Sequence, residues 1–264
     1  MRINNNITAI NSHRQYTINN SQIGKNVEKL SSGFRVNRAA DDAAGLAISE
    51  KMRTQIRGLN MASKNSQDGI SLVQTAEGAM QTAHNIMQRM RELAVQSANG
   101  TNDDAVDRNA LNLEFSQLNL ELSQIESTVK FNDMAIFDKT FEIQSGANET
   151  DKTSFYVGSL NTVTGQSISS STSASTAITA MQRAINTLST TRANLGAIQN
   201  RLEFKIQNLD NSAENLAAAE SRIRDADMAK MMTEFTKNNI LFQASTAMLA
   251  QANSMPQSVL QLLG

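Results

Sequence analysis

The chain has 264 residues, of which 40% are apolar and only 4% aromatic, with no Trp, no Cys and a formal net charge of -1. This charge gives no general attraction to nucleic acid, and the missing Cys excludes disulfides and thiolate metal sites. The sequence contains no run of about 20 apolar residues, the length that a helix needs to cross a bilayer. Because Ala, Leu, Met, Gln and Glu fit a helix at little entropic cost, the composition favours long helices over a rounded α/β core.

The N-terminal segment predicts an amphipathic helix that is short of apolar surface. It is rich in Asn, Ser and Gln, and its first 30 residues contain neither the apolar stretch nor the cleavage site of a Sec-type signal peptide. We therefore expect any export to use another route. Apolar residues at helical spacing form a narrow stripe, which comprises Ile3, Ile7, Ile10, Ile23, Val27, Leu30 and Phe34.

Two further helices are predicted between residues 76 and 129, where apolar residues recur at alternating spacings of three and four. The first run is Ala76, Met80, Ala83, Met87, Met90, Ala94 and Ser97, and the second is Leu111, Phe115, Leu118, Leu122, Ile125 and Val129. Gly100 is suited to end the first helix, and Asp103 or Asp104 to cap the second. We expect the two helices to fold back as an antiparallel pair.

From Phe131 to Leu160 the apolar period changes to about two, which predicts a β-hairpin. Its turn is expected at 146–148, between Phe141-Ile143 and Phe155-Val157 as the apolar flanks. Residues 161–176 follow with 10 Ser or Thr in 16. Such a segment cannot bury enough surface to offset its ordering entropy, so an exposed loop is expected. The middle of the chain would form an outward tip, and both ends the base.

A long rod-like helix is predicted from residue 178 to residue 223, because the spacing of three and four never slips there. Its length would be about 69 Å at about 1.5 Å rise per residue, too long for the interior of a small globule. Polar Arg192, Gln199 and Glu220 interrupt the stripe and are expected to set register or face solvent. With the two upstream helices, the rod predicts one coiled-coil-like bundle.

The C-terminal segment carries a second narrow apolar stripe. Large apolar residues recur every seven positions and the tail is apolar, at Met228, Phe235, Phe242, Leu249, Leu260 and Leu263. Isolated helices depend on packing for stability, and neither terminal helix has enough apolar surface to be stable alone. We therefore expect the ends to be loose in the monomer and to pair only when neighbouring subunits cover them.

These elements predict a mostly α fold. It is a long antiparallel coiled-coil-like helical bundle with a small β-hairpin region, and its N- and C-terminal helices pair at the base. The expected division is an N-terminal inner helix over 1–42, a helical hairpin plus β-hairpin over 43–176, the rod helix over 177–222 and a C-terminal inner helix over 223–264.

Groups suited to catalysis or metal binding are few. The two His residues, His13 and His84, lack the spacing of a zinc site, and the sequence has no phosphate loop and no Ser-His motif. Both His residues are expected to be structural. The sequence thus predicts no enzyme, no metal and no cofactor.

Two pairs of acidic residues allow more than one interpretation. Asp41-Asp42 could bind a cation through two carboxylates, but capping of the following helix or a turn is the expected role. Asp225 and Asp227 raise the same question, and for one of them we expect a salt bridge within or between subunits.

Long sequence blocks at both ends of the chain carry the most specific signal. They are KLSSGFRVN at 29–37, ADDAAGLAI at 40–48, QRMRELAVQ at 88–96, SRIRDADMA at 221–229 and QAN at 251–253. These blocks resemble the terminal signatures of the bacterial flagellin family. The resemblance extends over 1–140 and 177–264, with the variable middle of the family shortened, as in a short form without a bulky outer domain.

The resemblance implies a structural subunit that polymerises into the extracellular flagellar filament for swimming motility. It implies export of the unfolded chain through the flagellar type III apparatus, and an export chaperone that holds the apolar C-terminal segment. Filament cap and hook-filament junction proteins would be further partners. In this reading both terminal stripes are contacts between subunits.

Two sets of candidate sites follow from the same resemblance. Arg89, Leu93 and Glu114 occupy the family positions that Toll-like receptor 5 of animal hosts recognises, although Arg89 and Glu114 could simply pair across the helical hairpin. Some flagellins carry O-glycans on exposed hydroxyls, and the candidates here are Ser169, Ser170, Ser171, Thr172, Ser173, Ser175 and Thr176. An unmodified loop is the alternative.

Three other functions compete with this interpretation. A hook-filament junction protein shares the terminal helices, but the dense signatures at both ends favour flagellin. A secreted monomeric effector or enzyme should lack the apolar terminal stripes. A cytoplasmic coiled-coil adaptor is disfavoured by the unpaired termini and by the export-family signatures.

Overall fold

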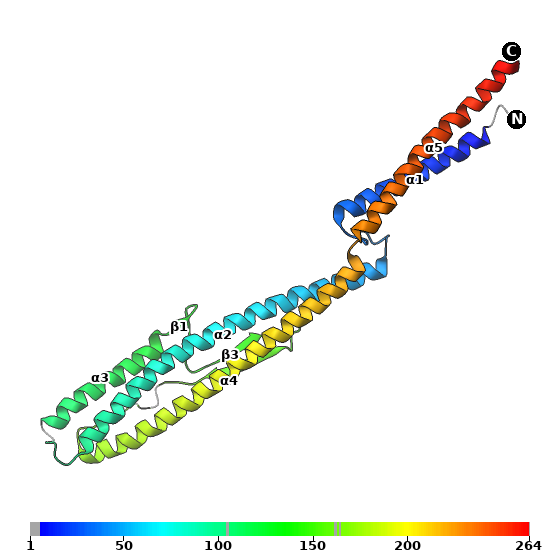
Figure 1. The fold of residues 1–264 in the computed structure, drawn as a ribbon. Coiled ribbons are helices and arrows are strands. Elements are labelled where there is room, and N and C mark those ends of the chain that lie inside the picture. Colours follow the sequence, from blue (N-terminus) through cyan, green and yellow to red (C-terminus); the bar gives the residue numbers. More distant parts are fainter. Residues whose placement is uncertain (1–5, 104–105, 161–162, 164, 264) are drawn as a thin grey trace. The chain divides into compact units, whose positions relative to one another are not determined.

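The computed structural model describes residues 6–103, 106–160, 163 and 165–263, with side chains described up to residue 255. The helices are α1 (Ile7–Ser32), α2 (Ala43–Ala98), α3 (Asp107–Thr128), α4 (Ser171–Arg224) and α5 (Met228–Leu263) (Figure 1). The strands are β1 (Lys130–Phe131), β2 (Met134–Ala135), β3 (Lys139–Gln144) and β4 (Lys152–Val157). The mostly α fold with a small β-hairpin region is confirmed.

The chain forms two compact units. The terminal unit combines Met1–Ile56 with Glu214–Gly264, and the central unit is Arg57–Ala213. Helices α2 and α4 therefore contribute one end to the terminal unit and most of their length to the central unit. The division at residues 42, 176 and 222 expected from the sequence stays a prediction.

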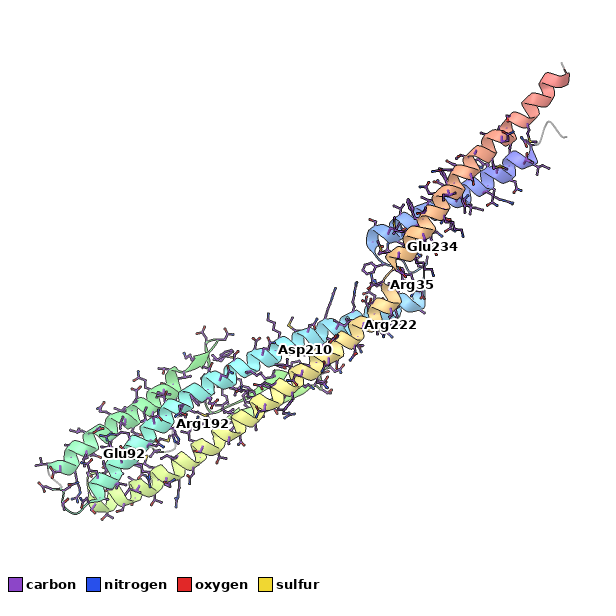
Figure 2. The ribbon with its side chains drawn as sticks, in the orientation of Figure 1. Arg35, Glu92, Arg192, Asp210, Arg222 and Glu234 are labelled. Carbon is purple, nitrogen blue, oxygen red and sulfur yellow. The ribbon has the colours of Figure 1, made fainter. Side chains whose placement is uncertain are left out.

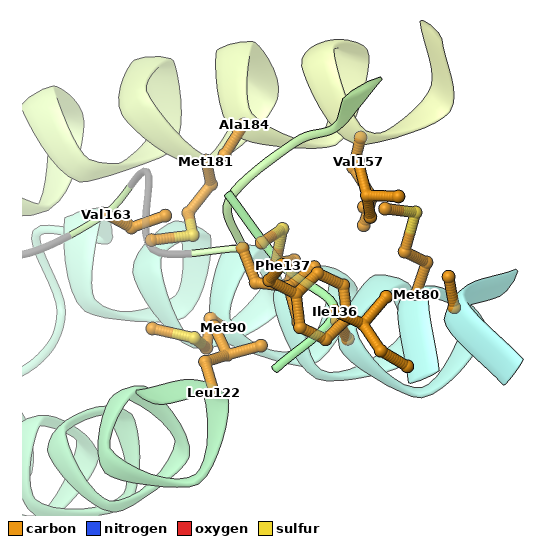
Figure 3. Close-up of a cluster of buried hydrophobic side chains, with 14 of the residues drawn as sticks. Met80, Met90, Leu122, Ile136, Phe137, Val157, Val163, Met181 and Ala184 are labelled. Atoms are coloured by element: carbon orange, nitrogen blue, oxygen red, sulfur yellow. The ribbon is translucent and has the colours of Figure 1, made fainter. Parts of the chain in front are cut away.

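The central unit is an antiparallel helical bundle. Arg192 of α4 pairs with Glu77 of α2 at 3.4 Å, and the Ser171 hydroxyl donates to the Ala98 carbonyl at 3.3 Å, so the two helices run in opposite directions. Between α2, α3 and α4 lies a core of buried apolar side chains (Figure 3). It includes Met80, Met87, Met90, Leu93, Phe115, Leu122, Ile136, Met181, Leu188 and Leu195, each at most 5% exposed.

A β-hairpin packs on the same core, where the sequence predicts it. Strands β3 and β4 are antiparallel, with Phe141 opposite Phe155. Thr153, Phe155 and Val157 of β4 are buried in alternation, as expected when one face of a hairpin lies on a core. A second, shorter hairpin pairs β1 with β2, an element that the sequence analysis missed.

Glycines of α2 give the hairpin close access to the helix. A Cβ placed at Gly58 would lie 2.9 Å from the Ala147 Cβ, and one at Gly69 would lie 3.1 Å from Ile143 Cγ1. The Asn65 side chain also donates to the Gln144 carbonyl at 3.2 Å. The hairpin and its turn thus pack against α2 at Gly58 and Gly69, where the helix has no side chains.

The expectation of an exposed loop over 161–176 is wrong for its described C-terminal part. Helix α4 already begins at Ser171, where the Ser170 hydroxyl accepts the Ser173 N–H at 3.3 Å and caps the helix. Ile168 and Ala174 are fully buried. The polar composition predicts a loop, but the Ser and Thr residues occupy the cap and outer face of a helix that a few apolar contacts hold on the core.

Of the two residues predicted to cap α3, Asp103 does not stand at the N-cap position. Val106 stands at the N-cap position and makes no side-chain cap hydrogen bond, while Asp104 lies outside the described residues. The Arg108 N–H instead donates to the main-chain carbonyl of Asp103 at 3.0 Å. Asp107 lies in the first turn, where its charge favours the helix dipole.

The terminal unit pairs α1 with α5 in antiparallel fashion, which confirms the predicted pairing of the chain ends. The Asn6 amide donates to the Ala252 carbonyl at 2.7 Å, and the Asn19 amide donates to Ser245 Oγ at 2.8 Å. The rings of Tyr16 and Phe242 lie 4.9 Å apart. These contacts join the two ends of one chain.

Candidate assembly and recognition surfaces

Much of the α1 stripe lies open to solvent. Ile7 and Ile10 are 65% and 64% exposed, and Val27 is 48% exposed. Ile23 and Leu30 are half-buried. Ile3 lies outside the described residues. The stripe that the sequence predicts is therefore an apolar face that α5 covers only in part.

The α5 stripe is divided in the same way. Phe235, Phe242 and Leu249 are half-buried, whereas Met228 is exposed. Leu260 and Leu263 lie in the helix but outside the described side chains. A second row of large apolar residues that the sequence analysis did not single out is also exposed: Met232, Ile240, Leu241, Met248 and Met255.

The α1–α5 pair buries little apolar surface. Among the described side chains of these two helices, only Asn26 and Ala252 are buried. Soluble monomers rarely expose contiguous large apolar patches, so such faces mark surfaces that another molecule covers. Asn6 and Asn19, which form hydrogen bonds between the two ends of the chain, set the register of the pair without adding apolar core.

Inside the terminal unit, Phe34 contacts residues of α2 and of the C-terminal end of α4. Phe34 forms an antiparallel bridge with Asp225, and its ring has the Arg224 guanidinium at 4.8 Å and the Arg53 guanidinium at 5.7 Å from its centroid. Arg224 also pairs with Glu50, and Arg53 lies 3.5 Å from Glu220. The apolar spacing predicts for Phe34 only a place in the α1 stripe, because no local pattern shows that Arg residues distant in the sequence lie over its ring.

Three residues of the two acidic pairs cap a helix or stabilise a turn. Asp42 Oδ1 accepts the Gly45 N–H at 2.9 Å at the start of α2, and Asp41 Oδ2 accepts the Arg38 N–H at 3.0 Å, which confirms the expected capping and turn roles. The Arg38 hydrogen bond is the largest influence that lowers the pKa of Asp41. Asp227 Oδ1 caps α5 through the Lys230 N–H at 3.1 Å. No group of His and acidic residues suited to a metal occurs in the described part of the chain.

The three candidate receptor residues do not share one surface. Arg89 and Glu114 pair at 2.9 Å across the α2–α3 hairpin, and their side chains are 50% and 46% exposed. Arg89 also pairs with Glu92, which Figure 2 labels on α2. The Glu114 hydrogen bond is the largest cause of the raised pKa of Arg89. Leu93 is 0% exposed and belongs to the core, so its side chain is not part of the surface that carries Arg89 and Glu114.

The candidate glycosylation residues line the start of α4. Ser169, Ser171, Thr172, Ser175 and Thr176 are exposed, whereas Ser170 and Ser173 are half-buried and hydrogen-bonded to each other. Ser175 Oγ donates to the Ser171 carbonyl at 3.0 Å. Several of these exposed hydroxyls thus also donate hydrogen bonds to main-chain carbonyls of the helix.

The two His side chains lie beside a polar side chain and an aromatic ring of their own helices. His84 contacts the Gln88 side chain at 3.0 Å, and His13 lies 6.4 Å from the Tyr16 ring.

Within the described residues, no helix combines the length and apolarity needed to span a membrane.

Two family models match the chain. Residues 3–142 match the bacterial flagellin N-terminal helical region, and residues 178–263 match the C-terminal helical region. The chain belongs to the bacterial flagellin family. Flagellins are structural proteins without enzymatic activity, in keeping with the sequence interpretation.

Individual flagellins match over their whole length. The flagellin of Halalkalibacterium halodurans is 57% identical over 272 residues, and that of Bacillus subtilis is 50% identical over 303, each with 100% of both chains covered. A flagellar filament core protein of Brachyspira hyodysenteriae is 46% identical over 285 residues, again with 100% of both chains covered. The crystal structure of Bacillus cereus flagellin matches with a TM-score of 0.52 and 34% identity, over 60% of this chain and 94% of that one.

Proposed function

We propose that this chain is the structural subunit of a bacterial flagellar filament and polymerises with copies of itself outside the cell for swimming motility. The observation that carries the proposal is the open apolar surface of the α1–α5 pair, in which only Asn26 and Ala252 are buried among the described side chains. Membership of the flagellin family makes further copies of the same chain the natural cover.

The energetics favour association through these helices. Burying one exposed Ile side chain contributes about 1.5–3 kcal/mol, and the pair exposes Ile7, Ile10 and Ile240 together with several Met residues. Association costs translational and rotational freedom, so only a surplus of burial yields a stable polymer. A regular array of neighbours supplies that surplus because each subunit is covered on several sides.

We further propose that the chain is exported unfolded through the type III apparatus and escorted by a chaperone that holds its apolar C-terminal segment. Two features support this route: the chain has no Cys that could lock a fold through disulfides, and the described part of α5 exposes many large apolar side chains before assembly. A subunit at either end of the polymer leaves the same surfaces open, which suits binding to cap and hook-filament junction proteins.

Polymerisation of purified monomer tests the main proposal. Ile240→Asn changes a side chain that is 61% exposed in the monomer, so we expect unchanged helical content but loss of filaments in electron micrographs. Thr246→Ala, at an exposed polar position of the same helix, is the matched control and should polymerise normally. Normal filaments from Ile240→Asn would remove this face from the assembly contacts, and failure of the wild-type chain to polymerise would contradict the proposal.

Recognition by Toll-like receptor 5 is a second proposal, supported by the exposed charges of Arg89 and Glu114. Their ion pair presents a guanidinium fork at the surface, whereas Leu93 would act only by holding α2 in place. Arg89→Ala should weaken binding of monomer to the receptor ectodomain, while Arg91→Ala, at an exposed position of the same helix, should not. Equal binding by Arg89→Ala and wild type would refute the assignment.

Glycosylation at the start of α4 is a proposal for the exposed hydroxyls of Ser169, Ser171, Thr172, Ser175 and Thr176. Ser170 is a poor acceptor because its hydroxyl caps the helix. The intact mass of protein purified from its native host should exceed the sequence mass by sugar residues. An unmodified mass would exclude the modification.

A further inference from the structure

The turn after α2 contains the single Asn-Gly pair of the sequence, Asn99-Gly100. Helix α2 ends at Ala98, and both residues of the pair are exposed. An Asn side chain followed by Gly is chemically vulnerable, because its amide carbon can be attacked by the main-chain nitrogen of the next residue and Gly adds no Cβ to obstruct that attack. The exposed turn leaves this reaction accessible.

The hydrogen bonds around Asn99 favour attack by the Gly100 nitrogen on the Asn99 side-chain amide. The Thr101 N–H donates to Asn99 Oδ1 at 3.4 Å. In the described part of the chain, the Gly100 N–H donates to no acceptor. A donor at Oδ1 stabilises the negative charge that this oxygen acquires when its carbon is attacked.

A buried cation lies against the main-chain carbonyl of the same Asn. Arg108 is 5% exposed, and its Nη2 donates to the Asn99 carbonyl oxygen at 2.8 Å while its Nε donates to the Ser97 carbonyl at 2.8 Å. A guanidinium polarises a carbonyl that it binds and stabilises negative charge on that oxygen. Arg108 therefore distinguishes the main-chain carbonyl of Asn99 from its side-chain carbonyl.

We propose that Asn99 is a site of spontaneous conversion to isoaspartate, directed by Arg108. The Gly100 nitrogen forms a bond to Asn99 Cγ, the Cγ–Nδ2 bond breaks, and ammonia leaves with the Gly100 proton, which gives a five-membered succinimide. Water then adds to the main-chain carbonyl carbon and the bond from that carbon to the Gly100 nitrogen breaks. The chain now continues through Cβ and Cγ, and the former main-chain carbonyl is a carboxylate.

Arg108 promotes this outcome at two stages. Its hydrogen bond activates the main-chain carbonyl of the succinimide over the side-chain carbonyl for attack by water. After hydrolysis the same oxygen carries a negative charge beside the guanidinium, so a hydrogen bond from a cation to a neutral carbonyl becomes an ion pair. The product remains docked on α3, and the net charge of the chain falls by one.

The test follows the full-length chain at neutral and mildly alkaline pH, both folded and unfolded in guanidinium. Peptide mapping by mass spectrometry measures replacement of NH by O at Asn99, and an isoaspartate-specific methyltransferase assay measures the ratio of isoaspartate to aspartate. We expect Asn99 to react in the folded chain, faster as pH rises, with a higher isoaspartate fraction than in the unfolded chain. Protection of Asn99 in the folded chain would overturn the proposal.

Three controls separate the parts of the mechanism. Asn65-Ser66 lies within α2 with Ser66 fully buried, and it should stay intact in the folded chain. Gly100→Ala should slow the reaction roughly tenfold, because the new methyl group crowds the attacking nitrogen. Arg108→Gln should lower the isoaspartate fraction toward that of the unfolded chain. Equal product ratios in folded wild type, folded Arg108→Gln and unfolded chain would remove Arg108 from the mechanism.

Discussion

Arg108 closes the end of α2 where water would otherwise solvate the last helix carbonyls. The final carbonyls of any helix lack partners within that helix. Here the guanidinium of a residue in α3 binds the carbonyl of Ser97, in the last turn of α2, and the carbonyl of Asn99, just beyond the helix. A buried charge is tolerated when it is hydrogen-bonded in this way. One side chain thus joins the start of α3 to the end of α2.

Asp41 should make the turn before α2 sensitive to acid. Its pKa is lowered, first by the Arg38 N–H, so its stabilising contribution is present above the unfolded pKa and is lost as the pH falls through the folded one. At a pH below the ordinary pKa of an Asp carboxyl, the N–H groups of Asn37 and Arg38, which both donate to Asp41 Oδ2, should lose their protection from hydrogen exchange.

Substitution separates this effect from general acid unfolding. Asp41→Asn should lose most of the protection at Asn37 and Arg38 already at neutral pH, because an amide oxygen accepts hydrogen bonds more weakly than a carboxylate. Glu234→Gln, an exposed acid on α5, should leave the pH profile unchanged. An unaltered profile in Asp41→Asn would show that another group controls the turn.

Single residues were predictable where they follow a helical period and not where they depend on a distant partner. The apolar positions of α2 such as Met80 and Met90 are buried as their spacing predicts. Leu93 lies beside that stripe and is buried too, although family resemblance suggested exposure. The roles of Arg108 and Phe34 arise only from segments that folding brings together.

At the scale of elements, α2 is both a rod and a platform. A helix interior disfavours Gly, yet α2 contains Gly58, Gly69 and Gly78. Gly58 and Gly69 leave room for the β3–β4 hairpin, since Ala147 and Ile143 lie close to the positions where their Cβ atoms would be. The third has nothing within 4 Å of its Cβ position, so no contact requires it.

The glycines of α2 should therefore differ in their response to Ala. Gly78→Ala should raise the free energy of unfolding by about 0.5–1 kcal/mol through helix propensity. Gly58→Ala should lose that gain or destabilise, because its Cβ would lie 2.9 Å from the Ala147 Cβ. Urea unfolding followed by circular dichroism measures both. A stabilised Gly58→Ala variant would mean that the hairpin turn moves away at little cost.

The elements were predictable to the extent that their periodicity is regular. The hairpin around Phe141 and Phe155 and the long α4 helix follow from spacing alone. The start of α4 did not, because Ser171–Thr176 have the composition of a loop and their helix depends on the buried Ile168 and Ala174. The β1–β2 hairpin was missed because its two-residue strands are too short to carry a period; its turn uses Asn132 and Asp133 with φ of 49° and 61°.

At the scale of the molecule, the two units differ in what holds them together. The central unit encloses a continuous core that includes Phe115, Met87 and Leu195. In the terminal unit, α1 and α5 are joined by hydrogen bonds of Asn6 and Asn19 and by the Tyr16–Phe242 contact, with little buried apolar surface. Because local stability follows buried apolar contacts, the central unit should resist opening far better than the α1–α5 pair.

Amide hydrogen exchange on monomer and polymer should reveal this difference. In the monomer we expect strong protection in the central parts of α2 and α4 and weak protection throughout α1 and α5, because helices with open apolar faces gain most of their stability from packing. In the polymer, neighbours cover Ile10 and Ile240, and protection of both helices should rise by orders of magnitude. Buried segments of the central unit provide the internal control, since assembly leaves their contacts unchanged. Full protection of α1 and α5 in the monomer would mean that the pair is stable by itself, and that assembly joins preformed surfaces instead of ordering them.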